Sequence, residues 1–245
     1  MTYETIEFEI KEHVALITLN REEAANALNV QMADELMDAA IRCDTEKSVR
    51  AVLITAMGKM FCAGGDLKVF SEAGNEVGVL AKKITTSLHA AVSRFARMAP
   101  PLVVAVNGTV AGGGLSLVLV ADMVLSARSG KFTLAYTRAG LVPDGSSTYF
   151  LPRLVGLRRA KELIFTNRVL NAEEALDWQL INQVLDDDLL QDEALKLAKS
   201  LADGPLATHG IVKHLLAETF SNHLESQMEA ESRGLAQALS GDEGQ

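Results

Sequence analysis

The sequence predicts an α/β core followed by an α-helical C-terminal region. Short apolar runs typical of buried strands alternate with segments of helical periodicity in the first part of the chain. Two of the predicted strands run directly into loops that carry several glycines. From Leu157 onward the pattern is helical to the end. Strands that alternate with helices and precede a helical tail indicate this fold class, and 245 residues suffice for one large or two small domains.

The N-terminal elements are predicted from their hydrophobic patterns. Residues 5–10 alternate polar and apolar side chains and residues 14–19 are mostly apolar, so the two segments indicate a hairpin. Residues 30–43 place apolar side chains on one face and acidic ones on the other, which predicts a helix. Residues 49–55 predict a second buried strand, and the polar, glycine-containing residues 71–78 predict a loop.

The later elements follow from the same patterns. A long amphipathic helix is predicted over about residues 80–98, ending at Pro100, and strands are predicted at residues 102–106 and 123–127. Residues 129–153 form a long irregular section, a kind of loop that is usually functional inside a compact domain. The helical pattern of the tail ends with three helices, near residues 187–203, 205–219 and 222–239.

Composition excludes several classes of function. The net charge of −9 and the absence of a basic run argue against nucleic-acid binding. The two cysteines, Cys43 and Cys62, give neither a disulfide framework nor metal-ligand spacing, so no metal site is predicted. No apolar run reaches membrane-spanning length, and the N-terminus lacks a charged-then-apolar leader. We therefore expect a cytoplasmic protein that binds neither nucleic acid nor membrane.

The most informative loop is the glycine triplet at residues 112–114. It follows a buried strand and leads into an apolar run with no helix breaker. The first N–H groups of a helix have no partner inside it, and glycine lets a ligand atom approach the backbone closely. The triplet therefore predicts a cradle for a negatively charged oxygen. The alternative is that its glycines only allow tight helix–strand packing.

Three known glycine motifs do not fit this loop. Gly114 stands where a phosphate loop requires lysine, and Leu117 stands where the dinucleotide fingerprint has its third glycine. The segment around Ser116 lacks the closing glycine of a serine-hydrolase elbow. A second glycine loop, residues 58–66, follows the strand predicted at residues 49–55. Because an oxyanion hole needs two N–H donors, which separate loops can supply, this pair of loops predicts one.

Motifs such as Asn26-Ala-Leu-Asn29 and Phe61-Cys-Ala-Gly-Gly-Asp-Leu-Lys68 follow one another along the chain. Together they resemble those of the crotonase superfamily, the enoyl-CoA hydratases and isomerases. The resemblance implies a crotonase-like spiral of β-β-α turns, with a core domain at residues 1–190 and a C-terminal helical trimerisation region at residues 191–245. It implies a homotrimer or homohexamer that acts on acyl-CoA thioesters in fatty acid metabolism; coenzyme A enters as part of the substrate, and no separate cofactor is expected. The main motifs are Asn26-Ala-Leu-Asn29, Phe61-Cys-Ala-Gly-Gly-Asp-Leu-Lys68 and Ala105-Val-Asn-Gly-Thr-Val-Ala-Gly-Gly-Gly114.

The resemblance also implies the residues of the oxyanion hole. Its donors would be the backbone N–H groups of Gly65 and Gly113, which suits an enolate that concentrates charge on one oxygen. On the same loop as Gly65, Ala63 and Lys68 are expected to bind the substrate, Lys68 at a coenzyme A phosphate. Relatives commonly carry a basic residue just before the early motif; here that position is not basic, which leaves Arg21 as a substitute.

The acid–base residues decide which reaction is expected. Hydratases of this superfamily use two glutamates, and the matching positions here are Ser116 and Tyr136, so these two residues are expected to line the substrate site and hydration is not expected. Asp144 matches the single catalytic acid of some enoyl-CoA isomerases. The resemblance thus predicts that Asp144 moves a proton from C2 of a 3-enoyl-CoA to C4, or isomerises a ring-type enoyl-CoA. From the local sequence alone, Asp144 is as readily part of a turn.

Two alternatives remain open. Asp144 and His89 also match the nucleophile and the base of 4-chlorobenzoyl-CoA dehalogenases, which favours dehalogenase-like or thioester-hydrolysing chemistry. Leu88 and Tyr136 stand where those enzymes have tryptophans, which argues against a benzoyl group as substrate. His89 lies on the predicted long helix, so it is either a pocket residue or an ordinary surface histidine. The other alternative is a non-catalytic relative that binds acyl-CoA.

Overall fold

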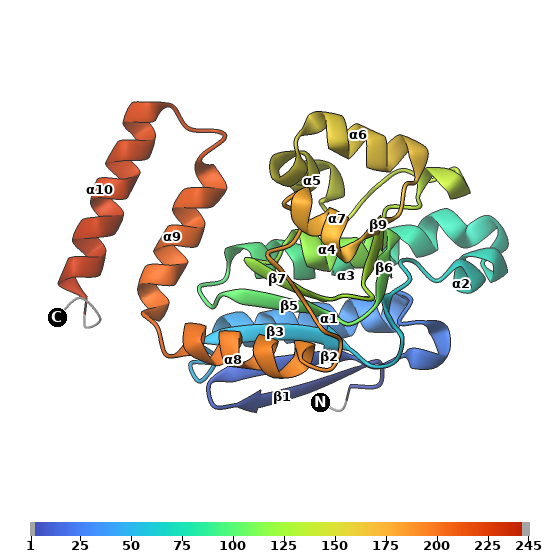
Figure 1. Ribbon diagram of the computed structural model, residues 1–245, viewed down its shortest axis with the longest axis horizontal. Helices are drawn as coiled ribbons and strands as arrows, with labels where there is room; N and C mark the ends of the chain where they lie inside the picture. Colours follow the sequence, from blue (N-terminus) through green and yellow to red (C-terminus); the bar gives the residue numbers. More distant parts are fainter. Residues whose placement is uncertain (1–2, 242–245) are drawn as a thin grey trace.

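The computed structural model describes residues 3–241, which form two β-sheets with helices around them (Figure 1). The strand order is β1-β2-β3-β5-β7-β10 in the larger sheet and β4-β6-β8-β9 in the smaller. The predicted α/β core and helical C-terminal region are confirmed. The strands of the larger sheet are β1 (Ile6–Lys11), β2 (Val14–Leu19), β3 (Ala51–Ala56), β5 (Leu102–Val106), β7 (Met123–Ala127) and β10 (Gln183–Leu185). Those of the smaller sheet are β4 (Met60–Cys62), β6 (Thr109–Ala111), β8 (Lys131–Thr133) and β9 (Leu170–Asn171).

Helices cover both faces of the larger sheet. On one face, α1 (Val30–Thr45) and α3 (Val77–Arg97) pack against each other and bury their apolar sides on the strands. On the other face, α8 (Leu190–Ala202) packs through Leu190 and a row of three alanines spaced for one side of a helix. Every residue of β5 is buried, as expected for a strand between two parallel neighbours in a sheet covered on both sides.

The predicted hairpin and the first helix are confirmed. β1 and β2 pair antiparallel, with Ile6 opposite Leu19. α1 begins after Asn29, whose side chain accepts a hydrogen bond from the N–H of Met32 at 2.9 Å and so caps the helix. The strands predicted at residues 102–106 and 123–127 are β5 and β7, with the predicted bounds.

The prediction that residues 129–153 form an irregular section is wrong in detail. The section contains β8, the short helix η4 (Thr137–Ala139) and the start of α5 (Ser147–Val155). Pro152 lies inside α5, so its missing N–H weakens the helix at one position without ending it. The loop expected at residues 71–78 is also mostly helical, because α2 (Leu67–Glu72) and η2 (Gly74–Glu76) lead directly into α3.

Strands β4, β6, β8, β9 and β10 have two or three residues each, which is too short for a hydrophobic period to show in the sequence. The glycine triplet itself forms the short helix η3 (Gly112–Gly114), which leads into α4 (Leu115–Leu119), and a further short helix, η1 (Glu22–Ala24), follows β2. Farther along, α6 (Leu157–Thr166) precedes α7 (Ala172–Asp177). The expected capping box is present at α7, where Asn171 and Glu174 exchange hydrogen bonds between side chain and backbone.

The last two helices, α9 (Leu206–Glu218) and α10 (Leu224–Ser240), form a hairpin that stands beside the sheets (Figure 1). Lys213 of α9 pairs with Asp122 at 2.7 Å and attaches the hairpin to the end of β5. No residue of α9 is buried, and Gly234 is the buried residue of α10. Apolar side chains on the hairpin are therefore exposed, among them Leu216, Phe220 and Leu224.

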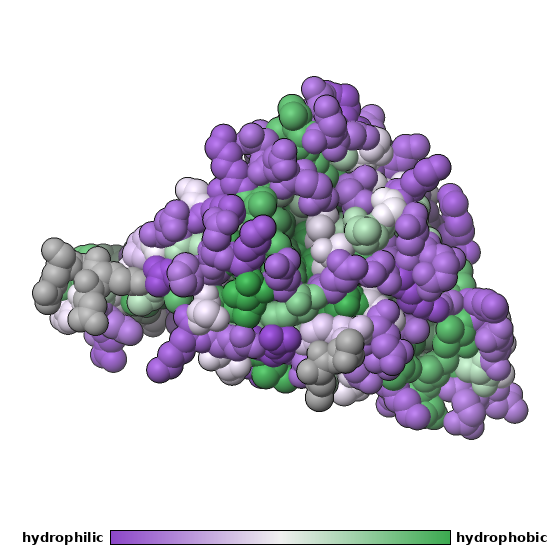
Figure 2. Space-filling model, turned by 90° about the horizontal axis from the view of Figure 1, so that it is seen from below, coloured by the Kyte–Doolittle hydropathy of each residue, from purple (hydrophilic) through white to green (hydrophobic). Residues whose placement is uncertain are grey.

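Within residues 3–241, no helix is long and apolar enough to cross a membrane. Hydrophilic side chains cover most of the face seen from below, with hydrophobic ones gathered in a few places (Figure 2). The predicted division at residues 190 and 191 stays a prediction, and its outer ends, residues 1–2 and 242–245, lie outside the described residues. α8, which falls in the predicted C-terminal region, packs on the larger sheet and not with the hairpin.

Candidate active site

The two glycine loops lie against each other. A Cβ atom added to Gly64 would lie 3.0 Å from the carbonyl oxygen of Ala111 and 3.3 Å from the nitrogen of Gly113. Gly64 also has a φ of +92°, a backbone conformation that side chains rarely adopt. Gly64 is therefore required twice, by its conformation and by the close approach of the second loop.

The early Asn26-Ala-Leu-Asn29 motif holds the first loop in place. The side-chain amide of Asn26, which is fully buried, donates hydrogen bonds at 2.9 Å to the carbonyls of Met57 and Met60. The N–H of Leu28 donates to the carbonyl of Gly64 at 2.7 Å, and the N–H of Asp66 donates to the carbonyl of Leu28 at 3.0 Å. The motif thus fixes the backbone on both sides of Gly65.

The backbone N–H groups of Gly65 and Gly113 are the two predicted donors of an oxyanion hole. Within residues 3–241, no backbone acceptor receives a hydrogen bond from the N–H of Gly65, and Gly113 lies in the first turn of η3, where N–H groups have no partner inside the helix. The helix that follows, α4, has only five residues. It is too short to add much of a helix dipole, so binding of an anion at this point would depend on the N–H groups themselves.

Asp66 stabilises the first loop. Its carboxylate accepts a hydrogen bond from Arg21 at 2.7 Å and caps α2 by accepting from the N–H groups of Lys68 and Val69. Burial alone would raise the pKa of Asp66, but the hydrogen bonds from Arg21 and the backbone outweigh it and lower the pKa below its ordinary value. Arg21 is thereby engaged with Asp66 and with the carbonyl of Ala27, and its expected role at a coenzyme A phosphate stays a prediction.

Asp144 lies in a different environment from Asp66. Its Oδ1 accepts a hydrogen bond from the hydroxyl of Tyr136 at 2.5 Å, and its Oδ2 lies 3.2 Å from Nε2 of His89. Burial, followed by the charge of Asp144, raises the pKa of Tyr136 well above its ordinary value, so the phenol stays protonated and acts as a donor. The side chain of Asp144 is 27% exposed and that of His89 is 49% exposed.

The contacts of His89 restrict where a proton can lie. The N–H of Gly145 donates to Nε2 of His89 at 3.1 Å, so Nε2 acts as an acceptor in that contact. An ionised carboxylate is also only an acceptor. With its one lone pair directed at the N–H of Gly145, Nε2 offers no proton to Oδ2 of Asp144 in this arrangement.

Asp144 lies close to the second glycine loop. A Cβ atom on Gly113 would lie 3.6 Å from the hydroxyl of Tyr136, the same hydroxyl that donates to Asp144. The side chain of Leu88 lies between the two segments, 3.9 Å from the Cβ positions of both Gly113 and Gly145. The acid and one of the two proposed oxyanion donors thus border the same site.

Gly145 brings the Asp144 loop down onto α4. Its φ is +56°, and a Cβ atom there would lie 2.1 Å from Oγ of Ser116. Ser116 is fully buried, and its hydroxyl has no hydrogen-bond partner among the described residues. Ser116 therefore lies beneath the loop, and its predicted contact with substrate stays a prediction.

The other predicted binding residues lie on the first loop. The N–H of Ala63 donates to the carbonyl of Ala25 at 3.0 Å, so Ala63 has a structural bond of its own. Lys68 lies in the first turn of α2 with an exposed side chain, and it forms no ion pair with any residue in the range 3–241. Lys68 is thus free to meet an anion.

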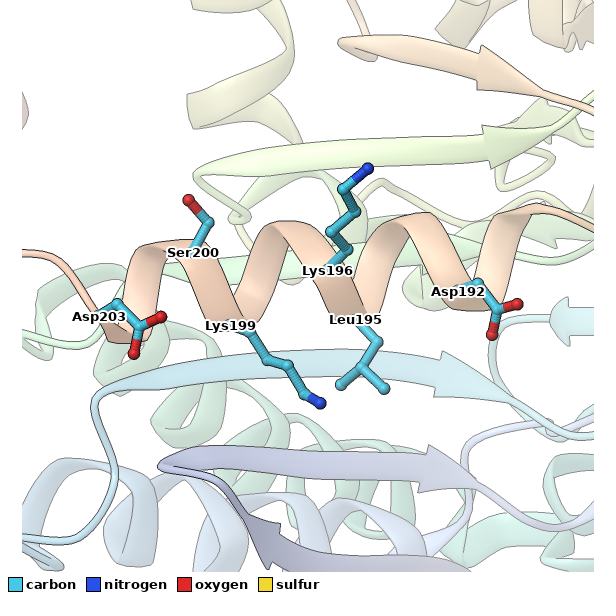
Figure 3. A pocket seen from close by; sticks show the side chains of 6 residues that line it. All are labelled: Asp192, Leu195, Lys196, Lys199, Ser200 and Asp203. Atoms are coloured by element: carbon cyan, nitrogen blue, oxygen red, sulfur yellow. The ribbon is translucent and has the colours of Figure 1, made fainter.

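The described part of the chain offers no competing metal or thiol chemistry. No group of three or more histidine, cysteine or acidic side chains within residues 3–241 is arranged to hold a metal ion. Burial raises the pKa values of both Cys43 and Cys62 to about 12, so both remain thiols near neutral pH. An open groove of about 490 Å³ lies along α8 and includes none of the predicted site residues; it is lined by Asp192, Leu195, Lys196, Lys199, Ser200 and Asp203 (Figure 3).

Comparison with known proteins identifies the family. The profile described as Enoyl-CoA hydratase/isomerase matches residues 9–245. The chain belongs to the enoyl-CoA hydratase/isomerase family. The crystal structure of an enoyl-CoA hydratase from Polaromonas superposes on this family member with a TM-score of 0.93 and 28% identity, covering 98% of this chain and 93% of the other. The crotonase-like fold is therefore confirmed.

The named relatives of this family member catalyse different reactions. The 1,2-epoxyphenylacetyl-CoA isomerase of Escherichia coli is 35% identical over 91% of this chain and 85% of its own length. A probable enoyl-CoA hydratase of Rhodobacter capsulatus is 39% identical, with coverages of 95% and 89%. The 4-chlorobenzoyl coenzyme A dehalogenase-2 of an Arthrobacter species is 34% identical, with coverages of 92% and 82%. Membership of the family indicates an enzyme that acts on acyl-CoA. It does not specify the reaction, which depends on the side chains of the site.

Several features of the site were not predicted from the sequence. The hydrogen bond from Tyr136 to Asp144 joins residues that are eight positions apart across a 3-10 turn, and no local pattern indicates it. The bond from Gly145 to His89 joins residues 56 positions apart. Phe70, which lies 2.7 Å from the Cβ position of Gly65, also borders the first loop. Only the glycine motifs gave a signal that these segments meet.

Proposed function

We propose that this family member is an acyl-CoA isomerase that uses Asp144 as its acid and base. The observation that carries the proposal is the position of Asp144 beside Gly113, with Tyr136 between them. Ser116 and Tyr136, which stand where the hydratases of this superfamily have glutamates, provide no second carboxylate to activate water. A single carboxylate suits the transfer of one proton between two carbons of the same substrate.

The proposed reaction has two steps. In the first, Asp144 takes a proton from C2 of a 3-enoyl-CoA, and the electron pair moves onto the thioester oxygen to give a dienolate. The N–H groups of Gly65 and Gly113 would hold that oxygen, and removing one such donor typically costs about 3 kcal/mol of barrier. In the second step Asp144 returns the proton at C4, which yields the 2-enoyl-CoA and regenerates the carboxylate. Lys68 would pair with a phosphate of coenzyme A.

The proposal is tested with purified protein and a panel of 3-enoyl-CoA thioesters. We expect the conjugated 2-enoyl-CoA to accumulate, followed by its ultraviolet absorbance and by mass spectrometry, with no gain of 18 mass units from water. The Asp144→Asn variant should form no product while still binding the thioester. Formation of a 3-hydroxyacyl-CoA from 2-enoyl-CoA at a comparable rate would contradict the proposal, because it would show hydration.

A hydrolytic reaction is the second candidate, and the contact between Asp144 and His89 favours it. In that mechanism Asp144 attacks the carbon that carries the leaving group, and His89 takes a proton from the water that cleaves the resulting ester. Leu88, which lies between Gly113 and Gly145, is aliphatic and offers no ring to stack on an aryl substrate. Release of halide from 4-chlorobenzoyl-CoA, or of free coenzyme A from a thioester, would favour this candidate over isomerisation.

We also propose that the α9–α10 hairpin joins copies of the chain in a trimer or a dimer of trimers. The support is the row of exposed apolar side chains on the hairpin, which a single chain leaves in water. Analytical ultracentrifugation should then give a mass of three or six chains. Replacing two of the exposed residues together, as in Leu224→Glu with Met228→Glu, should shift the protein toward monomer. The residues that carry the proposal are Val212, Leu216, Phe220, Leu224, Met228, Leu235 and Leu239.

A further inference from the structure

The two oxygens of Asp144 have different partners, and the difference bears on how a proton would be carried. Oδ1 accepts from the hydroxyl of Tyr136 at 2.5 Å. Oδ2 faces Nε2 of His89 at 3.2 Å, on a side chain that is half exposed. A neutral carboxylic acid places its proton on one oxygen and keeps the other as an acceptor. Because Tyr136 supplies a donor to Oδ1, the proton of a neutral Asp144 belongs on Oδ2.

The backbone of the same loop favours this arrangement. Gly145 donates its N–H to Nε2 of His89, so Nε2 acts as an acceptor and does not place a proton of its own on Oδ2. The carbonyl of Asp144 accepts from the N–H of Ser147 at 3.0 Å, and Gly145 rests on Ser116, so the loop itself is held from both sides. With the loop backbone held, the side chain of Asp144 can still rotate about its torsion angles. The hydrogen bond from Tyr136 restricts this rotation.

We propose that Tyr136 is a positioning residue that anchors Oδ1 of Asp144 and leaves Oδ2 as the oxygen that carries the transferred proton. The inference rests on the isomerase function proposed above. In the first step the C2–H bond breaks and the Oδ2–H bond forms, while the electron pair passes into the dienolate. In the second step the Oδ2–H bond breaks and the C4–H bond forms with a pair from the dienolate. Through both steps Tyr136 keeps its own proton.

Without the anchor, the carboxylate can rotate and present either oxygen to either carbon. Two consequences follow for a protein that lacks the Tyr136 hydroxyl. Turnover slows, because fewer orientations of Asp144 are productive. In addition, the dienolate is protonated at C2 and at C4 in a different proportion, because that proportion depends on where the acid is held.

The experiment compares Tyr136→Phe with the unmodified protein, using a 3-enoyl-CoA in D2O. We expect kcat to fall about 10-fold to 100-fold, the range for losing a hydrogen bond to a charged group, with KM changed less than about 3-fold. We also expect the ratio of deuterium exchange at C2 to isomerisation to change by at least about 3-fold. A purely structural role of Tyr136 would lower the fraction of folded protein and leave that ratio as it is.

Tyr3→Phe is the matched control. The hydroxyl of Tyr3 also donates to a carboxylate, Oδ2 of Asp38, at 2.6 Å and in a partly buried position, but it lies outside the candidate site. Its loss should leave kcat, KM and the exchange ratio unchanged. A second variant, Tyr136→Gln, keeps a side-chain donor and should retain more activity than Tyr136→Phe. If Tyr136→Phe does not fold, the exchange ratio is measured on Tyr136→Gln instead.

The possible outcomes separate the inference from the function on which it rests. Unchanged kcat and an unchanged exchange ratio in Tyr136→Phe, with isomerisation intact, overturn the inference alone. A rise in KM at constant kcat also overturns it, because Tyr136 would then bind substrate directly. In the Asp144→Asn background, Tyr136→Phe should cause no further loss of residual exchange, and an additional loss would contradict action through Asp144. Absence of isomerisation by the unmodified protein overturns the isomerase proposal and this inference together.

Discussion

Asp66 and Asp144 each lie at a glycine loop of the candidate active site, Asp66 at the end of the first and Asp144 beside the second, yet their surroundings differ. Asp66 is nearly buried, with a side chain 9% exposed, and it receives hydrogen bonds from Arg21 and from two backbone N–H groups. Asp144 is 27% exposed and has a phenol and an imidazole as partners. Asp66 is paired with a permanent cation, whereas neither partner of Asp144 is one.

The comparison shows how to tell a structural carboxylate from a reactive one in this fold. An arginine and backbone N–H groups stabilise only the ionised form, so Asp66 resists protonation. The tyrosine hydroxyl at Asp144 donates only to Oδ1, so a proton on Oδ2 would leave that hydrogen bond intact. Position beside a glycine loop therefore does not distinguish the two acids, whereas their sets of hydrogen-bond partners do.

The largest expected effect comes from exchanging each acid for its amide. Asp144→Asn keeps the size of the side chain but cannot accept a proton. We therefore expect kcat to fall by about 100-fold to 10,000-fold, the usual contribution of an acid–base group. The dissociation constant for an acyl-CoA should change by less than about 3-fold. Asp66→Asn, measured in the same assay, should keep kcat within about 10-fold. Equal losses in the two variants would remove the distinction between the acids.

The second expected effect concerns the free energy of unfolding, for which Asp66 should matter more than Asp144. Asp66→Asn leaves Arg21 without its anion in a mostly buried position, which should lower the free energy of unfolding by about 2 kcal/mol after allowance for the exposed part of the pair. Asp144→Asn should change it by less than about 1 kcal/mol. Urea denaturation of both variants at pH 7 measures the difference. A more stable Asp66→Asn protein would show that the ion pair does not stabilise the loop.

The contribution of Asp66 to stability should depend on pH. Because the pKa of Asp66 is lower in the folded protein than in the unfolded chain, its contribution to stability is present above the unfolded pKa of about 4 and is lost as pH falls through the folded pKa. The stability gap between the unmodified protein and Asp66→Asn should therefore shrink as the pH is lowered below about 4. Urea unfolding at a series of pH values provides the test, and a gap that widens on acidification would contradict it.

The smallest expected effect concerns Ser116. Its hydroxyl is buried without a partner among the described residues, so Ser116→Ala should leave the free energy of unfolding unchanged or raise it by up to about 1 kcal/mol. kcat and KM should stay within about 2-fold of the unmodified values. A rise of KM by 10-fold or more would instead support the contact with substrate predicted from the sequence.

The sequence by itself determined the fold class and the location of the glycine loops. Alternating patterns predicted the hairpin and the first helix, and the motifs containing Gly65 and Gly113 indicated the family, because a backbone that needs glycine leaves a visible mark in the chain. Strands of two or three residues left no such mark, and neither did a helix that contains Pro152.

Only the tertiary structure decided which partners each acidic residue has. Asp66 meets Arg21 across 45 positions, and Asp144 meets His89 across 55. Periodicity and turn propensity describe a residue and its near neighbours, whereas the protonation behaviour of a carboxylate depends on donors that other layers of the fold bring to it. The sequence therefore named Asp144, and the packing of its loop against α3 and α4 gave it Tyr136 and His89 as partners.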